Sequence, residues 1–193
     1  MASCARFILA GTLMFLAQET VSAQKTQKKL DLKDKVVNID GFKSEAPKDW
    51  IRQKPSNLLR SYQFALPRAE GDKEDAEMGI LPGISGSDEA NIARWTRMFR
   101  PPEGKTYKDI ATVQKMKVAG GKVLVTVLDV SGTYLKKNRP LDPDFKARPM
   151  PGYRMFAIIF ETPDDVTLIR VIGPAKTMAH HQKNLMAWLK AFK

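Results

Sequence analysis

The sequence predicts a single α+β domain, in which an antiparallel β-sheet of about five to seven strands carries helices on its faces. The first observation is that apolar, β-branched runs occur in pairs joined by short turns, as in β-hairpins. The second is that two other segments repeat their apolar residues with the period of a helix. The clearest strand pairs are 113–119 with 122–130, joined through Gly120-Gly121, and 153–161 with 166–172.

Residues 1–23 are predicted to be a cleaved signal peptide. Arg6 supplies a positive start, 7–17 is an apolar run, and Val21-Ser22-Ala23 has the small-x-small pattern of a cleavage site. The run is shorter than the about 20 residues that span a bilayer, which favours cleavage over the alternative, an uncleaved signal anchor. Residues 24–35 are polar and are predicted to form a flexible leader, and 36–193 to form the domain.

The first part of the domain is predicted to hold three strands and a buried tryptophan. The strands are 36–39, 60–66 and 78–81, with a loop at 41–48. Apolar residues alternate along 60–66, which is typical of a strand with one buried face. Trp50 is predicted to fill the core. The acidic connection 70–77 is predicted to be a solvated hairpin loop; a calcium site is the alternative, although the spacing differs from that of a calcium-binding loop.

The segment 81–102 is predicted to contain the end of a strand, a glycine turn and a helix. The turn is Gly83–Gly86, where glycines permit a sharp change of direction. Ser87 or Asp88 can cap the first free amides of the helix. Pro101 then ends the helix, because proline cannot continue it.

The predicted helix has one apolar and one basic face. At about 100° per residue, Ile92, Trp95 and Phe99 share the face towards the sheet. Three arginines share the opposite face: Arg94, Arg97 and Arg100. Such an arginine row is either a contact surface for an acidic partner or a solvated helix face.

The later strands surround one irregular stretch. Residues 123–128 are apolar on both faces and are predicted to form a central strand covered on both sides. Residues 132–154 contain four prolines and are predicted to be a long loop. This loop supplies the second set of candidate contact residues, Lys136, Lys137 and Arg139. The alternative is a variable insertion without a role.

The last helix is predicted to begin at Gly173-Pro174 and to pack on the sheet. Its apolar arc consists of Met178, His181, Leu185, Trp188, Leu189 and Phe192. His181 is therefore expected in the core, whereas His180 points outward. Adjacent residues of a helix point about 100° apart, so the pair is not expected to share a metal ion.

The charge and the missing motifs narrow the function classes. The net charge is +11, which favours acidic partners. The single cysteine, Cys4, lies in the signal peptide, so the mature chain has neither a disulfide nor a cysteine nucleophile. No nucleotide-binding loop, Gly-x-Ser-x-Gly motif or nucleic-acid motif is present. No cofactor or metal is predicted.

Several short motifs together point to a family. They are Pro47-Lys-Asp-Trp50, Phe64-Ala-Leu-Pro67, Glu70-Gly-Asp72, Asn91-Ile-Ala-Arg-Trp95 with Phe99, Ser131-Gly-Thr-Tyr134, Pro151-Gly-Tyr-Arg154 and Gly173-Pro174. In these motifs the chain resembles a family of exported bacterial proteins of unknown function. The order of its elements is similar to the Mog1/PsbP-like fold, an α/β/α sandwich around an antiparallel sheet. The strand end Met78–Gly83 departs from the pattern. The resemblance covers most of 40–193 and implies a role in binding other proteins.

The sequence therefore predicts a monomeric, non-catalytic binding module in the periplasm or outside the cell, with an acidic envelope protein as its partner and no nucleic acid. Its first contact candidates are the three arginines, and its second the three residues of the loop. Two alternatives stay open. One is a structural protein with affinity for anionic polysaccharide or lipid, including peripheral contact with a membrane. The other is a hydrolase that uses the Gly83–Gly86 loop as an oxyanion site.

Overall fold

The computed structural model describes residues 31–83, 86–137 and 146–193. The predicted signal peptide, residues 24–30 of the predicted leader, and Arg139 lie outside the described residues. Within the described part, no helix has the length and apolar character needed to cross a membrane.

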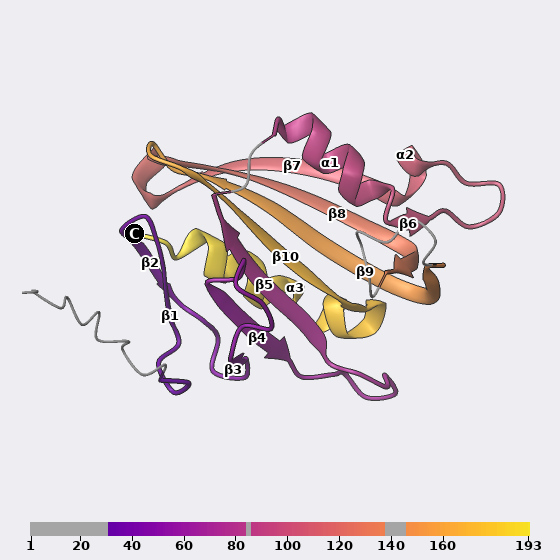
Figure 1. The fold of residues 1–193 in the computed structure, drawn as a ribbon, viewed down its shortest axis with the longest axis horizontal. Coiled ribbons are helices and arrows are strands. Elements are labelled where there is room, and N and C mark those ends of the chain that lie inside the picture. Colours follow the sequence, from indigo (N-terminus) through magenta and orange to yellow (C-terminus); the bar gives the residue numbers. More distant parts are fainter. Residues whose placement is uncertain (1–30, 84–85, 138–145) are drawn as a thin grey trace, which may run out of the picture.

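The centre of the molecule is an eight-stranded antiparallel sheet (Figure 1). Its strands are β3 (Ile51–Gln53), β4 (Tyr62–Leu66), β5 (Ala76–Pro82), β6 (Phe99–Arg100), β7 (Ala111–Val118), β8 (Val123–Lys136), β9 (Arg148–Glu161) and β10 (Val166–Pro174). They lie in the order β3-β4-β5-β10-β9-β8-β6, and β7 pairs with the first half of β8. A separate hairpin joins β1 (Val36–Ile39) and β2 (Phe42–Glu45). In Figure 1 the C-terminus lies beside β2, where Lys43 and Lys193 exchange two backbone hydrogen bonds.

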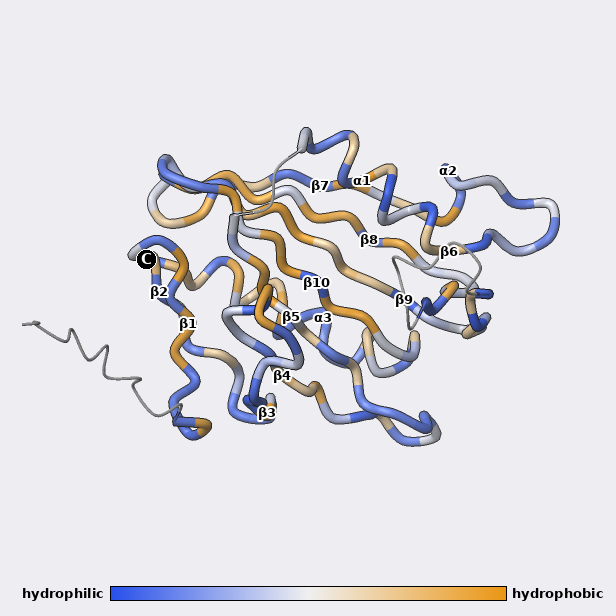
Figure 2. Tube along the Cα trace, viewed as in Figure 1, coloured by the Kyte–Doolittle hydropathy of each residue, from blue (hydrophilic) through white to orange (hydrophobic). Residues whose placement is uncertain are grey.

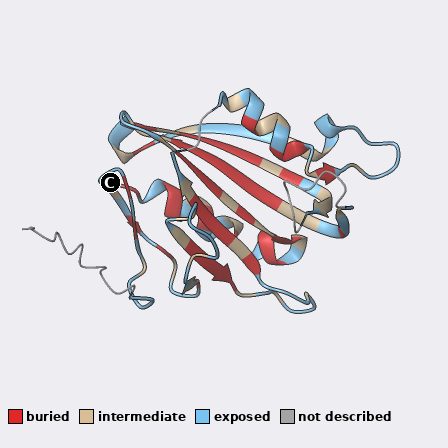
Figure 3. Cartoon of the chain, in the orientation of Figure 1, coloured by how far each residue is buried: buried red, intermediate tan, exposed pale blue. Residues whose placement is uncertain are grey.

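Helices cover both faces of the sheet. The helices are α1 (Asp88–Thr96), α2 (Tyr107–Ile110) and α3 (Ala175–Lys190). Neighbouring strand residues separate into two cores: Ile158 packs with α3, whereas Ile159 packs with α1. The central strands are the most hydrophobic and most deeply buried segments (Figures 2 and 3). The predicted α+β sandwich is thus confirmed. Its physical reason is that the central strands are apolar on both faces, so each face of the sheet has to be covered by a helix.

Most predicted elements are confirmed. The hairpins β4–β5, β7–β8 and β9–β10 form as expected, and the apolar arc of α3 is buried. Two details of the first part were wrong. β2 lies within the predicted loop 41–48, and β4 is buried on both faces. The second face is covered because Gln63 is held between Gln53, Arg60 and Glu77 on the flanking segments.

The predicted loop 132–154 was also wrong, since strands fill most of it. β8 continues to Lys136, and β9 begins at Arg148. On its other side β9 pairs with β10 only from Tyr153 onward. Pro149 and Pro151 therefore lie where that ladder requires no backbone donor, which is how a strand accepts proline.

Helix α1 is shorter than predicted. It ends at Thr96, and Arg97 caps it. The chain then turns, and Phe99–Arg100 form β6 against Thr133 and Tyr134 of β8. Burial of Phe99 in the core and the backbone bond from Leu135 N to Met98 O (2.8 Å) favour this turn over another helical turn. The predicted arginine row on one helix face is therefore wrong: Arg94 is helical, whereas Arg100 lies on a strand.

The acidic connection 70–77 caps α3. Pro174 stands at the N-cap, where its side chain offers no acceptor. The Asp72 carboxylate caps the helix instead: it accepts hydrogen bonds from Thr177 N (2.8 Å) and Thr177 Oγ1 (2.6 Å). Asp75 accepts from Arg68 N (3.0 Å), and Glu74 accepts from the Tyr153 hydroxyl. The predicted solvated loop is thus partly an internal capping segment.

Asp72→Ala is expected to lower the free energy of unfolding by about 1 kcal/mol, the usual cost of losing a helix cap. Urea unfolding followed by far-UV circular dichroism measures this change. Glu70→Ala is the matched control, since Glu70 is an exposed carboxylate of the same loop. Equal stabilities of the two variants would contradict the capping role of Asp72.

Candidate functional site

Three of the predicted contact residues meet in one pocket of about 410 Å³ beside the end of α1. We call it the basic pocket. Its described lining residues are Arg94, Arg97, Met98, Tyr134, Leu135, Lys137, Ala147 and Arg170. None of these lining residues is acidic. Arg94 and Arg97 come from the helix and Lys137 from the end of β8, so both predicted groups contribute to the same cavity.

A series of hydrogen bonds at the start of α1 orients Arg94. Ser87 caps α1 by accepting from Ala90 N (3.2 Å), as predicted. Asn91, one turn later, is buried and donates to the backbone oxygens of Gly86 (3.4 Å) and Ser87 (3.2 Å). Its Oδ1 accepts from Arg94 Nη2 at 2.7 Å. A buried amide thus holds one guanidinium at the pocket, which reduces the side-chain entropy lost on binding.

Arg170 is the pocket residue that the sequence interpretation missed. It lies in β10 on the α1 face of the sheet, with Gly79 of β5 and Ala157 of β9 as its cross-strand partners. Neither neighbour has a large side chain, so the sheet leaves room for a guanidinium. The available signal was a single arginine within the apolar run 166–172. A charge at such a position is unusual without a partner or a function.

Tyr134 forms the aromatic wall of the pocket. Its ring stacks on Tyr153, with centroids 6.0 Å apart, and lies 5.5 Å from the ring of Phe99. Burial raises the pKa of the Tyr134 phenol above its ordinary value, although the positive charge of Arg170 opposes this shift. The hydroxyl therefore stays protonated at neutral pH and can donate a hydrogen bond to an anion.

The other predicted contact residues lie outside the basic pocket. Arg100 is exposed on β6, opposite Thr133, and Lys136 is exposed opposite Arg148. A smaller cavity of about 230 Å³ shares Arg94, Met98 and Arg170 with the basic pocket and reaches Trp95. The described basic surface therefore continues along the sheet side of α1, away from the face that the sequence predicted.

The predicted hydrolase site finds no support around Ser87. Its hydroxyl is engaged as the helix cap, and Ser85 lies outside the described residues. Both histidines are on α3, which packs on the opposite face of the sheet. A serine–histidine relay would require the two groups within hydrogen-bond reach.

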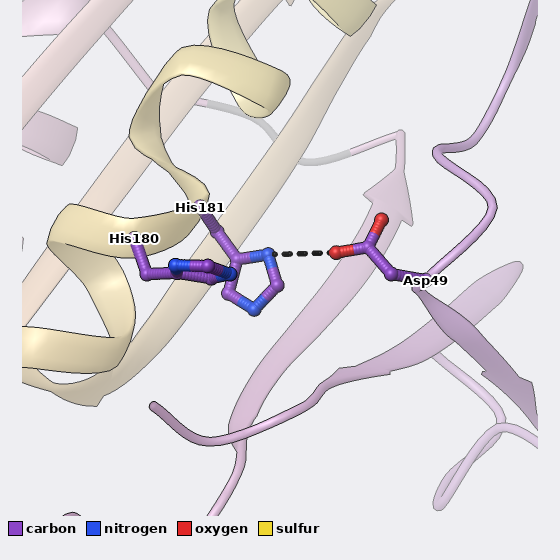
Figure 4. A group of neighbouring side chains, drawn as sticks. All are labelled: Asp49, His180 and His181. Atoms are coloured by element: carbon purple, nitrogen blue, oxygen red, sulfur yellow. Dashed lines mark ion pairs between the residues drawn. The ribbon is translucent and has the colours of Figure 1, made fainter. Parts of the chain in front are cut away.

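The histidine pair lies next to Asp49 (Figure 4). His181 is 2% exposed, as predicted for a core residue, and His180 is exposed. Asp49 belongs to the turn closed by Trp50 N and Pro47 O (3.1 Å), which directs Trp50 into the core. Asp49 Oδ2 lies 3.4 Å from His181 Nδ1. One potential ligand atom from each of the three residues lies within 4.8 Å of the others.

Comparison with solved structures finds 14 similar chains, among them the following two proteins. PA94 of Pseudomonas aeruginosa, a protein of unknown function, is 14% identical, with a TM-score of 0.42, over 80% of this chain and 92% of that chain. Mog1p, a Ran-binding protein of Saccharomyces cerevisiae, is 11% identical, with a TM-score of 0.44, over 84% of this chain and 96% of that chain. Comparison with protein-family models and with curated protein sequences finds no match.

Proposed function

We propose that the chain is an exported, non-catalytic binding module of the cell envelope, and that it holds an acidic group of a partner protein in the basic pocket. The observation that carries this proposal is the convergence of Arg94, Arg97, Lys137 and Arg170 on one cavity. Export rests on the signal-peptide pattern of residues 1–23.

The geometry of the pocket suits a carboxylate. Guanidinium groups present paired donors that match the two oxygens of a carboxylate or the oxygens of a phosphate. Met98, Leu135 and Tyr134 add apolar walls around these donors. A cavity of about 410 Å³ lies within the range of typical ligand sites, which is about 300–1,000 Å³. Such a pocket can enclose an acidic side chain together with part of the segment that carries it.

The polyanion alternative depends on charge alone. An anionic polysaccharide or lipid surface would be attracted by the overall charge of +11, wherever the basic residues lie. Its binding would weaken steeply with salt, because exposed charges are screened. The concave, partly apolar pocket favours the protein partner, since a flat repeating polyanion would leave its apolar walls unfilled.

The test compares two double variants of equal net charge. Arg94→Glu/Arg97→Glu changes the pocket, whereas Lys117→Glu/Lys122→Glu changes two exposed lysines of the β7–β8 hairpin. The protein is used to capture partners from an envelope extract, with elution along a salt gradient. The affinity of the retained acidic protein for each variant is then measured by calorimetry. We expect the pocket variant to bind at least about 100-fold more weakly, because charge-assisted hydrogen bonds contribute about 1.5–3 kcal/mol each.

The lysine variant is expected to bind like the unmodified protein. An equal loss of affinity in both variants would contradict binding in the basic pocket. Binding would then depend on the overall charge alone. Heparin and phosphatidylglycerol vesicles serve as probes for the alternative. If they bind as tightly as any protein and no acidic protein survives moderate salt, the polyanion function replaces the proposed one.

A further inference from the structure

The imidazole of His181 has one satisfied and one unsatisfied nitrogen. Nε2 lies 2.8 Å from the backbone oxygen of Pro67. Because a carbonyl oxygen only accepts, Nε2 must carry the proton of this hydrogen bond. In the neutral ring, Nδ1 then carries a lone pair. Nδ1 is buried and has no hydrogen-bond partner among the described residues.

The unsatisfied nitrogen faces a carboxylate. Asp49 Oδ2 lies 3.4 Å from it, and the Asp49 side chain is 44% exposed. Two electron-rich atoms that face each other across this gap form a place where both can coordinate one metal ion.

The distances match those of a metal centre. Zinc binds imidazole nitrogen at about 2.0–2.1 Å and carboxylate oxygen at about 2.0–2.2 Å, so two ligand atoms of a tetrahedral site lie about 3.3–3.4 Å apart. The gap between His181 and Asp49 has this length. The bond from Nε2 to Pro67 is also the outer-shell contact that usually fixes the orientation of a metal-binding histidine.

His180 offers a third potential ligand atom in spite of its position next to His181. The ring centroids of the two histidines are 4.9 Å apart, and the rings are inclined at 88°. A ring nitrogen of His180 lies within 4.8 Å of the other two ligand atoms. His180 is exposed, so its side chain can change rotamer to bring this nitrogen closer. The expectation that the pair does not easily share a metal ion considered only the directions in which the side chains leave the helix.

We propose that Asp49, His180 and His181 bind one divalent transition-metal ion, with Zn²⁺ as the reference ion. Two imidazoles and one carboxylate suit Zn²⁺, Cu²⁺ or Ni²⁺ better than Ca²⁺ or Mg²⁺, which prefer all-oxygen sites. Three protein ligands leave a fourth position open to water or to a partner's side chain. Bound metal would tie the 47–50 turn to α3. The site lies on the opposite face of the sheet from the basic pocket and is independent of the proposed function.

The test is calorimetric titration of the purified protein, without a histidine tag, with ZnCl₂. We expect one Zn²⁺ per chain. Asp49→Asn and His180→Ala should each weaken binding at least 10-fold, because even the loss of an outer-shell partner costs about 10–100-fold. Asp49 and His180 are exposed, so these variants are expected to fold. Asp164→Asn is the matched control, an exposed carboxylate in the β9–β10 turn.

A second measurement distinguishes a defined centre from loose surface binding. Co²⁺ in a tetrahedral site of mixed nitrogen and oxygen ligands gives visible absorption bands, which Zn²⁺ should abolish in competition. We expect these bands in the unmodified protein and in Asp164→Asn, and their loss in Asp49→Asn. No zinc binding, or equal binding in all the variants, would overturn the proposal.

Discussion

Replacing Trp50 with alanine is expected to lower the free energy of unfolding by about 3–5 kcal/mol, the range for deleting a large buried aromatic side chain. Trp50 is fully buried between the sheet and α3. Its ring centroid lies 5.6 Å from that of Trp188 and 6.3 Å from that of Phe64. The cavity would open at the point where the 47–50 turn, the sheet and α3 meet, so little of the surrounding structure can collapse into it. A loss of this size is a large part of the about 5–15 kcal/mol that stabilises a typical domain.

Urea unfolding followed by far-UV circular dichroism measures this loss, since tryptophan fluorescence changes with the substitution itself. Tyr107→Ala is the matched control: Tyr107 is an aromatic residue with 46% exposure, and its replacement should cost less than about 0.5 kcal/mol. Trp50→Phe should cost much less than Trp50→Ala, because the buried indole N–H has no acceptor among the described residues. A cost below about 1 kcal/mol for Trp50→Ala would contradict its central place in this core.

The parts of the fold that sequence reasoning predicted correctly depend on neighbours along the chain. The β7–β8 hairpin follows from two apolar runs around Gly120-Gly121, and the β9–β10 hairpin from a similar pair. The buried arc of α3 follows from the helical period alone. In each case the turn residues and the apolar period lie within one segment, so no distant contact was needed to find the element.

The errors arise where pairing with another strand decides the local structure. Whether α1 continues past Thr96 depends on β8, which takes Phe99 and Arg100 into the sheet. The prolines of 132–154 predict a loop, but β9 accepts Pro149 and Pro151 because it has no partner on its β10 side there. The partner of Phe99 is Tyr134, more than thirty residues along the chain, whereas 148–150 pair with 134–136 of β8, within the stretch predicted to be a loop.

The candidate sites show the same division. Arg94, Arg97 and Lys137 could be named from their charge, but their meeting with Arg170 depends on the order of the strands. The histidines could likewise be placed on α3, whereas Asp49 reaches them through the turn that buries Trp50. Periodicity tells which face of an element a residue occupies. It does not tell which residues of other elements lie opposite that face.

Gly173→Ala is expected to destabilise the protein by about 3 kcal/mol, at the upper end of the range for overpacking a core. A Cβ atom at this position would lie 2.5 Å from Ala76 Cβ and 2.7 Å from Ala76 Cα. Both residues are buried where β10 passes β5 just before α3 begins. The clash involves the backbone of β5, so relief requires the two strands to separate. That movement would disturb the adjacent pairs Ile172–Glu77 and Val171–Met78, the second of which is buried in the α3 core.

Gly79→Ala is the matched control for this prediction, because Gly79 of β5, like Gly173 of β10, is a strand glycine without a positive φ. A Cβ atom there would meet side-chain atoms of Arg60 at 3.1 Å and no backbone atom at that distance, so Arg60 has to shift by only a small distance beside its ion pair with Glu77 (2.9 Å). The cost should be below about 1 kcal/mol, since alanine also reduces the entropy of the unfolded chain. Thermal and urea unfolding of both variants compare the two positions directly. Equal stabilities would show that β5 and β10 can separate at Gly173 without loss, and the close approach of these strands would then not be the reason for glycine before α3.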